Sequence, residues 1–348
     1  MSLKDIKSMS REELLSFITE LGYPKFRCDQ IYSWLHQKFI TSFEDMTNLP
    51  KKMIEELSRI CYISVANIEK KLVSSYDNTV KYLFRLYDNE YVEAVVMDYH
   101  HGYSMCISTQ VGCKMGCTFC ATGQGGFVRD LSASEMLSQI HTAQKDLSVR
   151  ISNVVLMGMG EPLDNFSNLV RFLHLATDEK ALGIGARHIT VSTCGIVPKI
   201  YELADLQIPV NLALSLHAPT DEMRSKTMPI NKKYPVRDVL EACRYYAQAT
   251  GRRITYEYAM ISGVNDSDHC AQLLAEQIRG TLCHVNLIPV NPVQGTGYIP
   301  SIDKRLISFV SVLSKYNINS TVRRTLGSDI NASCGQLRGK KLKDKGGV

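Results

Sequence analysis

The pattern of apolar residues changes from helical to strand-like within the first hundred residues. Residues 1–62 contain three runs with apolar positions at helical spacing, and Ser10–Glu13 before the first run has the order of a capping box. Gly22–Pro24 ends that helix. In residues 79–98, two apolar runs flank Asp88–Glu90, which predicts a β-hairpin. We therefore expect a helical N-terminal part followed by a hairpin.

From residue 105 onward, strand-like runs alternate with amphipathic helical runs. The segments with the short apolar composition of buried strands are 105–109, 151–157, 187–192, 210–216, 254–261, 283–289 and 318–323. One of the helical runs between them begins with a second capping box, at Ser132–Glu135. Such alternation predicts an α/β fold with a parallel sheet. About six strand–helix units are too few for a closed eight-fold barrel.

Four loops that follow predicted strands carry residues suited to ligand binding. They are the cysteine-rich loop after 105–109, Gly158–Pro162, Ser192–Gly195 and Ser215–Pro219. The carboxyl ends of parallel strands meet at one edge of a sheet, and ligands of such folds bind there. The sequence therefore predicts one site formed by these four loops.

The composition is that of an ordinary globular protein, with 45% hydrophobic and 22% charged residues. No run reaches the length of an apolar membrane span, and the N-terminus lacks the apolar core of a signal peptide. We therefore expect a cytoplasmic protein that does not contact the membrane. The eleven cysteines are an odd number, and the cytosol keeps thiols reduced, so a disulfide framework is excluded.

The net charge of +5 is concentrated at the C-terminal end of the chain. Residues 321–348 contain seven Lys or Arg and two Asp, which accounts for the whole excess. A basic segment on a neutral body is typical of a protein that binds a polyanion. A solvated tail that aids solubility explains the same charge equally well.

Three cysteines have the spacing of a metal site. Cys113, Cys117 and Cys120 form C-x3-C-x2-C, without the second C-x2-C pair of structural zinc sites. Three thiolates suit three corners of a cubic iron–sulfur cluster whose fourth iron stays open for a substrate or cofactor. Zinc and a closed structural cluster are the alternatives. Cys106 lies earlier, within a predicted strand, so we do not expect it to be the fourth ligand.

This triad, with Phe119 before its last cysteine, resembles the signature of the radical S-adenosylmethionine (SAM) superfamily. The resemblance covers residues 99–330 and implies a partial (β/α)6 radical SAM barrel. It also implies a 4Fe-4S cluster whose open iron binds SAM, which is cleaved to a 5′-deoxyadenosyl radical. The positions that it assigns to SAM binding are Gly160, Glu161, Ser192, Ser215, Leu216, His217 and Asn291. A structural glycine turn at Gly160 and a structural histidine at His217 remain alternatives.

Further strings occur in an order typical of one branch of that superfamily. They are VEAVVM (92–97), GMGEPLDN (158–165), GVNDS (263–267), HVNLIPVNP (284–292) and GSDINASCGQL (327–337). Together they resemble the RlmN family of adenine methyltransferases, relatives of the Cfr resistance enzymes. The resemblance implies methylation of adenine carbon-2 in 23S rRNA and in tRNA, next to the anticodon. Carbon-8 methylation, as in Cfr, and a non-catalytic RNA-binding protein with a structural metal are the alternatives.

The same resemblance implies roles for three more residues. Cys334 would be methylated by one SAM, converted to a methylene radical by a second SAM, and joined covalently to the adenine. Glu93 would act as the general base, and Cys106 would release the RNA by forming a disulfide with Cys334. The alternatives are that Cys106 is an ordinary strand cysteine and that Glu93 lies on an exposed hairpin edge.

We expect four segments along the chain. Residues 1–75 form a helical accessory part that contacts RNA, and residues 76–98 form a hairpin extension of the core. Residues 99–330 form the radical SAM core, and residues 331–348 form a loop with the reactive cysteine and a basic tail. The resemblance implies 23S rRNA and tRNA as partners, an electron donor such as flavodoxin or ferredoxin, and a monomeric protein.

Overall fold

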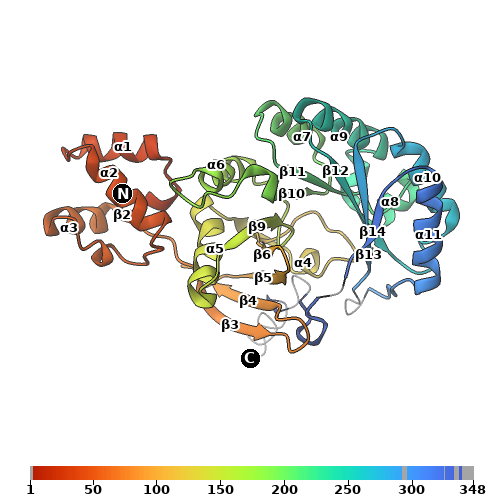
Figure 1. Ribbon diagram of the computed structural model, residues 1–348, viewed down its shortest axis with the longest axis horizontal. Coiled ribbons are helices and arrows are strands. Elements are labelled where there is room, and N and C mark those ends of the chain that lie inside the picture. The colour runs from red at the N-terminus through yellow and green to blue at the C-terminus, as the bar shows by residue number, and fades with distance from the viewer. Residues whose placement is uncertain (1–2, 292–295, 325, 333–336, 339–348) are drawn as a thin grey trace.

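The computed structural model describes residues 3–291, 296–324, 326–332 and 337–338, and a ten-stranded sheet lies at its centre (Figure 1). Its parallel strands are β6 (Gly102–Cys106), β9 (Ile151–Leu156), β10 (Ile189–Thr193), β11 (Asn211–Ser215), β12 (Ile254–Met260), β13 (Cys283–Pro289) and β14 (Ser320–Val322). Six of these strands lie at predicted segments, and the parallel sheet is confirmed. The position predicted for the first strand, 105–109, is wrong in its second half, because β6 begins at Gly102 and ends at Cys106.

Helices follow each parallel strand before β14. They are α5 (Ala133–Leu147), α6 (Phe166–Thr177), α7 (Val197–Asp205), α8 (Asp221–Thr227), α9 (Val236–Thr250), α10 (Asp268–Ile278) and α11 (Asp303–Lys315). Figure 1 shows α7, α9, α10 and α11 on the outer side of the strands. In the described part of the chain, six strand–helix units and a final strand therefore form the predicted partial (β/α)6 barrel.

The two faces of the parallel sheet differ in polarity. Leu212 and Tyr256 belong to the main hydrophobic core. Ser215, Glu257 and Asn286 are register partners on three neighbouring strands, and they lie on the opposite face because successive residues of a strand alternate. The inner face of the partial barrel is therefore polar where the predicted ligand site lies.

Three antiparallel strands extend the sheet beyond β6. The predicted hairpin is confirmed as β4 (Val80–Arg85) and β5 (Tyr91–Tyr99), and β5 pairs with β6. The sequence analysis missed β3 (Asn67–Val73), which pairs with β4 and forms the sheet edge. Six of its seven residues are exposed, so it lacks the apolar alternation that reveals a half-buried strand. Its lysines are typical of an edge strand.

The N-terminal part consists of α1 (Arg11–Glu20), α2 (Phe26–His36) and α3 (Lys51–Ile60), with β1 (Lys4–Asp5) paired to β2 (Cys61–Tyr62). The predicted capping box of Ser10 and Glu13 begins α1. This part contacts the core through polar pairs. Tyr32 donates a hydrogen bond to Asp178 at 2.7 Å.

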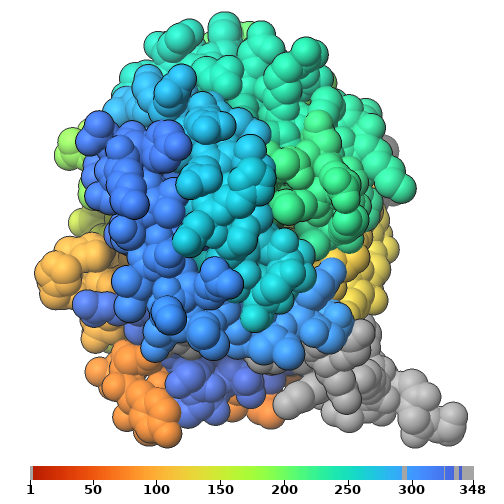
Figure 2. Space-filling view, turned by 90° about the vertical axis from the view of Figure 1, so that its right-hand side faces the viewer, coloured from red at the N-terminus to blue at the C-terminus, as the bar shows by residue number. Residues whose placement is uncertain are grey.

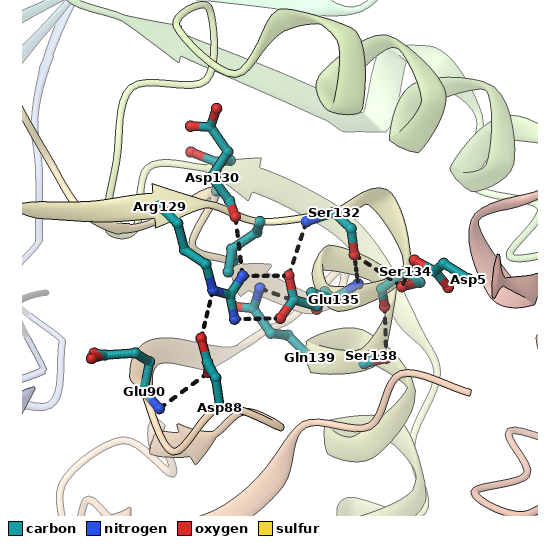
Figure 3. A network of polar contacts seen from close by, with 12 residues as sticks. Asp5, Asp88, Glu90, Arg129, Asp130, Ser132, Ser134, Glu135, Ser138 and Gln139 are labelled. Carbon is teal, nitrogen blue, oxygen red and sulfur yellow. Dashed lines mark hydrogen bonds and ion pairs between the residues drawn. The ribbon is translucent and has the colours of Figure 1, made fainter. Parts of the chain in front are cut away.

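A polar network fixes the start of α5 (Figure 3). The Arg129 guanidinium donates to both carboxylate oxygens of Glu135 at 2.8 Å and to Asp88 in the β4–β5 turn at 2.6 Å. Glu135 also completes the predicted capping box with Ser132. Ser134 Oγ donates to Asp5 of the N-terminal part at 2.6 Å. The network therefore joins the hairpin, α5 and the N-terminal part.

The end of the described chain returns to the antiparallel strands. Figure 2 shows blue C-terminal residues beside the orange residues of the hairpin region. The Ser75 backbone N–H donates to Asp329 at 2.9 Å, and the Gly327 N–H donates to Asp77 at 2.8 Å. Lys81 Nζ donates to the carbonyl of Asn331 at 2.8 Å. These bonds hold residues 326–332 over the hairpin.

Candidate active site

The cysteine triad lies in an irregular insertion between β6 and α5. The insertion contains β7 (Gln110–Gly112), β8 (Phe127–Asp130) and the short helix α4 (Ala121–Gln124). Gly112 has φ +82°, and a Cβ there would lie 1.8 Å from the carbonyl oxygen of Gly126, so only glycine fits this hairpin. The Thr118 N–H donates to the Thr227 carbonyl at 2.9 Å, which ties the insertion to α8.

The three thiols are partly buried and within electrostatic reach of one another. Burial raises the pKa of Cys113 to about 12, with further increases from Glu161 and Cys120. The pKa of Cys117 is also raised, first by burial and then by Cys120 and Cys113. Three neighbouring thiolates therefore require a cationic partner, and an iron–sulfur cluster is such a partner. Over the described ranges no three His, Cys, Asp or Glu side chains already converge as metal ligands.

Glu161, in the loop after β9, joins this loop to the end of β10. Its carboxylate accepts hydrogen bonds from the N–H groups of Cys194 at 2.7 Å and Leu163 at 3.1 Å. Its side chain is buried, and burial raises its pKa. A carboxylate here suits the amino group of a ligand, while its backbone partners fix its orientation.

The glycines of this loop pack against protein. A Cβ at Gly158 would lie 2.5 Å from the carbonyl oxygen of Ile107, and one at Gly160 would lie 2.6 Å from Cβ of Gln110. Both glycines thus let the loop after β9 approach the start of the cysteine insertion. This geometry favours the structural-turn interpretation of Gly160.

Ser192, Ser215, Leu216 and His217 lie at the ends of β10 and β11, as predicted. Both serines are partly buried, whereas the Leu216 side chain is in the core. The N–H groups of Leu216 and His217 donate to the carbonyl of Glu257. This loop is therefore anchored to β12.

His217 links this loop to the cysteine insertion. Its ring contacts Phe119 edge-on, with centroids 4.9 Å apart, and its Nδ1 accepts the Ala259 N–H at 2.9 Å. Burial and then Arg224 lower its pKa to about 3. The ring is therefore neutral near pH 7, and because Nδ1 accepts, Nε2 carries the proton. His217 presents a donor at Nε2.

Cys106 faces a cavity inside the partial barrel and is only 5% exposed. It packs with Val95, Met97, Met157 and Ala332. The cavity has a volume of about 190 Å³. Its lining includes Cys106, Asn291, Arg323, Arg324 and Ala332. Two predicted site residues that are far apart in the chain, Cys106 and Asn291, are thus brought to one cavity.

Glu93 is fully buried, so the exposed-edge alternative is wrong. Its Oε2 lies 2.9 Å from Lys81 Nζ, and both side chains are 0% exposed. Its Oε1 accepts the backbone N–H of Arg338 at 2.7 Å. Cys334 lies outside the described residues. The described residues nearest to it in the chain, Ala332 and Leu337–Arg338, adjoin Cys106 and Glu93 respectively.

The sequence analysis missed three polar residues of this region. Lys81 forms an ion pair with Glu93. The sequence did contain a signal for this pair, because a lysine and a glutamate lie on the two strands of the predicted hairpin. Glu257 is 4% exposed and accepts a hydrogen bond from Asn286 at 2.8 Å. Arg224, on α8, is 0% exposed, and nothing in its local sequence distinguishes it from a surface arginine.

No described helix is long and apolar enough to cross a membrane.

Comparison with known proteins agrees with this geometry. Residues 107–273 match the radical SAM superfamily, and residues 4–63 match the ribosomal RNA large subunit methyltransferase N-terminal domain. The chain is 53% identical to a probable dual-specificity RNA methyltransferase RlmN of Alkaliphilus oremlandii, over 98% of this chain and 99% of that protein. It is 50% identical to the corresponding protein of Clostridium novyi, with 97% and 98% covered.

A solved structure has the same fold over nearly the whole chain. A radical SAM methyltransferase from Sphaerobacter thermophilus superposes with a TM-score of 0.91 at 39% identity, covering 96% of this chain and 98% of that one. The partial barrel, the cysteine insertion and these matches together show that the chain belongs to the RlmN family of radical SAM methyltransferases.

Proposed function

We propose that this enzyme methylates carbon-2 of adenine in 23S rRNA and in tRNA, with Cys334 as the carrier of the methyl group. The observation that carries the proposal is the position of the residues on either side of Cys334. Ala332 lines the Cys106 cavity, and the Arg338 N–H is bonded to Glu93. A transfer through a methylated cysteine requires a carrier thiol, a second thiol and a carboxylate, which Cys334, Cys106 and Glu93 would supply.

The cofactors fit the chemistry of the predicted site residues. Cys113, Cys117 and Cys120 would hold a 4Fe-4S cluster, which would supply the electron for the reductive cleavage of SAM. Glu161 would bind the SAM amino group. Polar atoms near Gly160, Ser192, Ser215, Leu216, His217 and Asn291 would bind the remaining SAM groups. Because the His217 Nε2 carries a proton, it would donate to a SAM oxygen or ring nitrogen.

The release of the RNA would use Glu93 and Cys106. The adenine adduct would give up one electron to the cluster, and Glu93 would accept its carbon-2 proton. The Cys106 thiolate would attack the sulfur of Cys334, so that an S–S bond forms and the bond between that sulfur and the methylene carbon breaks. The methylene carbon keeps the electron pair of the broken bond and takes up a proton, which completes the methyl group. A thiol reductant would then regenerate both cysteines. The Lys81 ammonium balances the burial of the Glu93 carboxylate and holds it in place.

Two exposed arginines support RNA binding at the same cavity. Arg323 and Arg324 follow β14 and line the cavity together with Cys106. Guanidinium groups at this position would bind the phosphates beside an adenine that enters the cavity. The same proposal includes three further expectations. Residues 1–75 contact the RNA, the enzyme is a cytoplasmic monomer, and flavodoxin or ferredoxin supplies its electrons.

The decisive experiment reconstitutes the purified protein with iron and sulfide without oxygen, then adds SAM, a reductant and either RNA. Liquid chromatography of the digested RNA with mass detection, against synthetic standards that separate the two methyladenosine isomers, is expected to show 2-methyladenosine. Detection of 8-methyladenosine would instead assign the Cfr-type reaction. Tight RNA binding without SAM cleavage would assign a non-catalytic RNA-binding protein and overturn the proposal.

A further inference from the structure

Three aromatic rings cluster at the turn between β5 and β6. Tyr99 ends β5, Gly102 begins β6, and the turn between them consists of His100 and His101. The rings of Tyr99 and His101 are stacked, with centroids 5.2 Å apart and planes 13° from parallel. His100 meets His101 edge-on, with centroids 5.0 Å apart. All three residues are exposed, and Tyr99 is 36% exposed. The rings therefore pack on one another at the surface.

Tyr99 also belongs to the wall of the Cys106 cavity. Val95, Met97 and Tyr99 lie on one face of β5, because successive residues of a strand alternate, and all three line the cavity. The Tyr99 hydroxyl donates to Met97 Sδ at 3.7 Å, which holds the ring against this wall. The aromatic cluster therefore joins the cavity to the exposed turn.

The neighbouring strand β9 fixes the position of this turn. Gly102 has φ +114°, and a Cβ there would lie 2.7 Å from Ser152 Oγ, so only glycine allows this close approach. Ser152 Oγ in turn donates to the carbonyl of Tyr103 at 3.1 Å. Rings that are held in place before a ligand arrives lose little conformational freedom when it binds.

The cavity lies where the two ends of the partial barrel approach each other. Tyr99 is on β5, whereas Arg323 and Arg324 follow β14, and the six strands β13, β12, β11, β10, β9 and β6 lie between them in the sheet. One end of the barrel thus supplies an aromatic ring and the other supplies two guanidinium groups. This combination is typical of sites that bind single-stranded nucleic acid.

We propose that the Tyr99 ring stacks on the nucleobase next to the adenine that enters the cavity. The inference rests on the RNA substrate of the proposed function. An adenine that enters the cavity leaves the stack of bases in its loop, so its neighbour loses a stacking partner. Tyrosine and histidine rings replace such a partner in single-stranded RNA, and every base has a face that stacks. Tyr99, supported by His101, thus positions the RNA through a base rather than a phosphate.

The test uses an anticodon stem-loop RNA with the fluorescent base 2-aminopurine beside the target adenine, titrated with the reconstituted protein without SAM. Tyr99→Ala is expected to weaken RNA binding about tenfold. The saturated complex should also be brighter than that of the parent, because the fluorescent base is no longer quenched by a ring. The slope of log K against log salt concentration should not change, because no phosphate contact is removed.

Two variants serve as controls for the ring. Tyr99→Phe keeps the ring and is expected to match the parent in affinity and brightness. Tyr245→Ala removes a tyrosine of similar exposure, 40%, from the outer helix α9, where its hydroxyl is bonded to Asp205. Neither measurement should change in Tyr245→Ala.

Two results would overturn the inference: equal affinity and brightness in the parent and Tyr99→Ala, or equal losses in Tyr99→Ala and Tyr99→Phe. If Tyr99→Ala does not fold, His101→Ala decides, because removal of the supporting ring should weaken binding and brighten the complex, and no change would contradict the proposal. A parent protein that does not bind the RNA would refute the proposed function. A parent that binds and methylates the RNA, while Tyr99→Ala binds it equally well, would refute this inference alone.

Discussion

Lys81 and Glu93 form an ion pair, 2.9 Å between Nζ and Oε2, in which both side chains are fully shielded from solvent. The two residues come from adjacent strands of the hairpin and point to its inner face. Lys81 also donates to the carbonyl of Asn331, and Glu93 accepts the N–H of Arg338. The pair therefore connects the hairpin to the residues on both sides of Cys334.

Replacement of Lys81 by methionine is expected to destabilise the protein strongly. The change leaves the Glu93 carboxylate buried without its counter-charge, and removal of one partner of a buried pair typically costs about 3–5 kcal/mol. Urea denaturation at pH 7 measures the free energy of unfolding. The double variant Lys81→Met/Glu93→Gln is expected to recover much of the loss, because no unpaired charge remains.

The matched control is Lys71→Met, which removes a partly exposed partner of Asp146. Exposed pairs contribute about 1 kcal/mol or less, so this variant is expected to stay close to the parent. Equal losses in Lys81→Met and Lys71→Met would show that burial of the Lys81–Glu93 pair does not matter.

The sequence was sufficient for features that depend on local order. Strand–helix alternation, the two capping boxes and the Cys113–Cys120 spacing all follow from neighbouring residues, and the parallel strands other than β6 lie where predicted. The orientation of Glu93 could not be predicted, since both faces of β5 are buried. Alternation identifies a face only when one side of a strand is solvated.

The residues that the sequence analysis missed depend on tertiary contacts. Arg224 lies in the polar helical run DEMRSKT, and arginine in such a run is normally exposed. Its burial becomes apparent only when the ends of β10 and β11 are seen to meet above it. The close approach at Gly160 likewise depends on Gln110, which lies fifty residues away in the chain.

Replacement of Cys106 by alanine is expected to trap a covalent complex between protein and RNA. Without a second thiol in the cavity, the sulfur of Cys334 cannot be displaced from the methylated adenine. Denaturing gel electrophoresis with labelled tRNA detects the complex. Cys243→Ala removes a buried thiol from the core side of α9 and is the control, with normal release expected. Normal turnover by Cys106→Ala, with no complex, would refute the resolving role.

Serine substitution at Cys113, Cys117 or Cys120 is expected to abolish binding of the cluster, because each removes one of three thiolate ligands. Iron analysis and visible absorption after anaerobic reconstitution measure the loss. Cys194→Ala is a close control: this thiol is buried beside Glu161, and burial raises its pKa well above the usual value. Because Cys194 follows β10 and lies outside the C-x3-C-x2-C loop, its replacement should preserve the iron content. Iron loss in Cys194→Ala equal to that in the triad variants would reject the ligand assignment.

Replacement of both Arg323 and Arg324 by glutamine is expected to weaken RNA binding and to make the binding constant less dependent on salt concentration. Each arginine that neutralises a phosphate contributes about one to the slope of log K against log salt concentration, so the double variant should lose up to about two. Fluorescence anisotropy with labelled tRNA between low and physiological salt measures the slope. Arg237→Gln removes a highly exposed arginine on α9, remote from the cavity, and should leave the slope unchanged. An identical slope in the parent and the double variant would remove these arginines from the RNA interface.

His36 gives a prediction for stability against pH. It is fully buried between α2 and α5, near His141 and Lys7, and within the described part of the chain neither ring nitrogen has a hydrogen-bond partner. Burial, and then Lys7, lowers its pKa from 6.5 to about 3. The unfolded chain therefore binds a proton below pH 6.5 that the folded protein does not bind, and stability is lost as pH falls from 6.5 towards 3.

His36→Leu removes the imidazole, so that neither the folded nor the unfolded chain can bind a proton at this position. Between pH 7.5 and 5.5 the free energy of unfolding of the variant is expected to fall by about 1.4 kcal/mol less than that of the parent. This difference is the free energy that one titrating group contributes over the one pH unit between 6.5 and 5.5. At pH 7.5 it should be as stable as the parent or more stable, because two unpartnered polar atoms are removed. Urea denaturation at both pH values measures the difference, with the exposed His269→Leu as control. Equal losses in the parent and His36→Leu would show that His36 is protonated, or solvated, in the folded protein, and that the contact between α2 and α5 is looser than its burial implies.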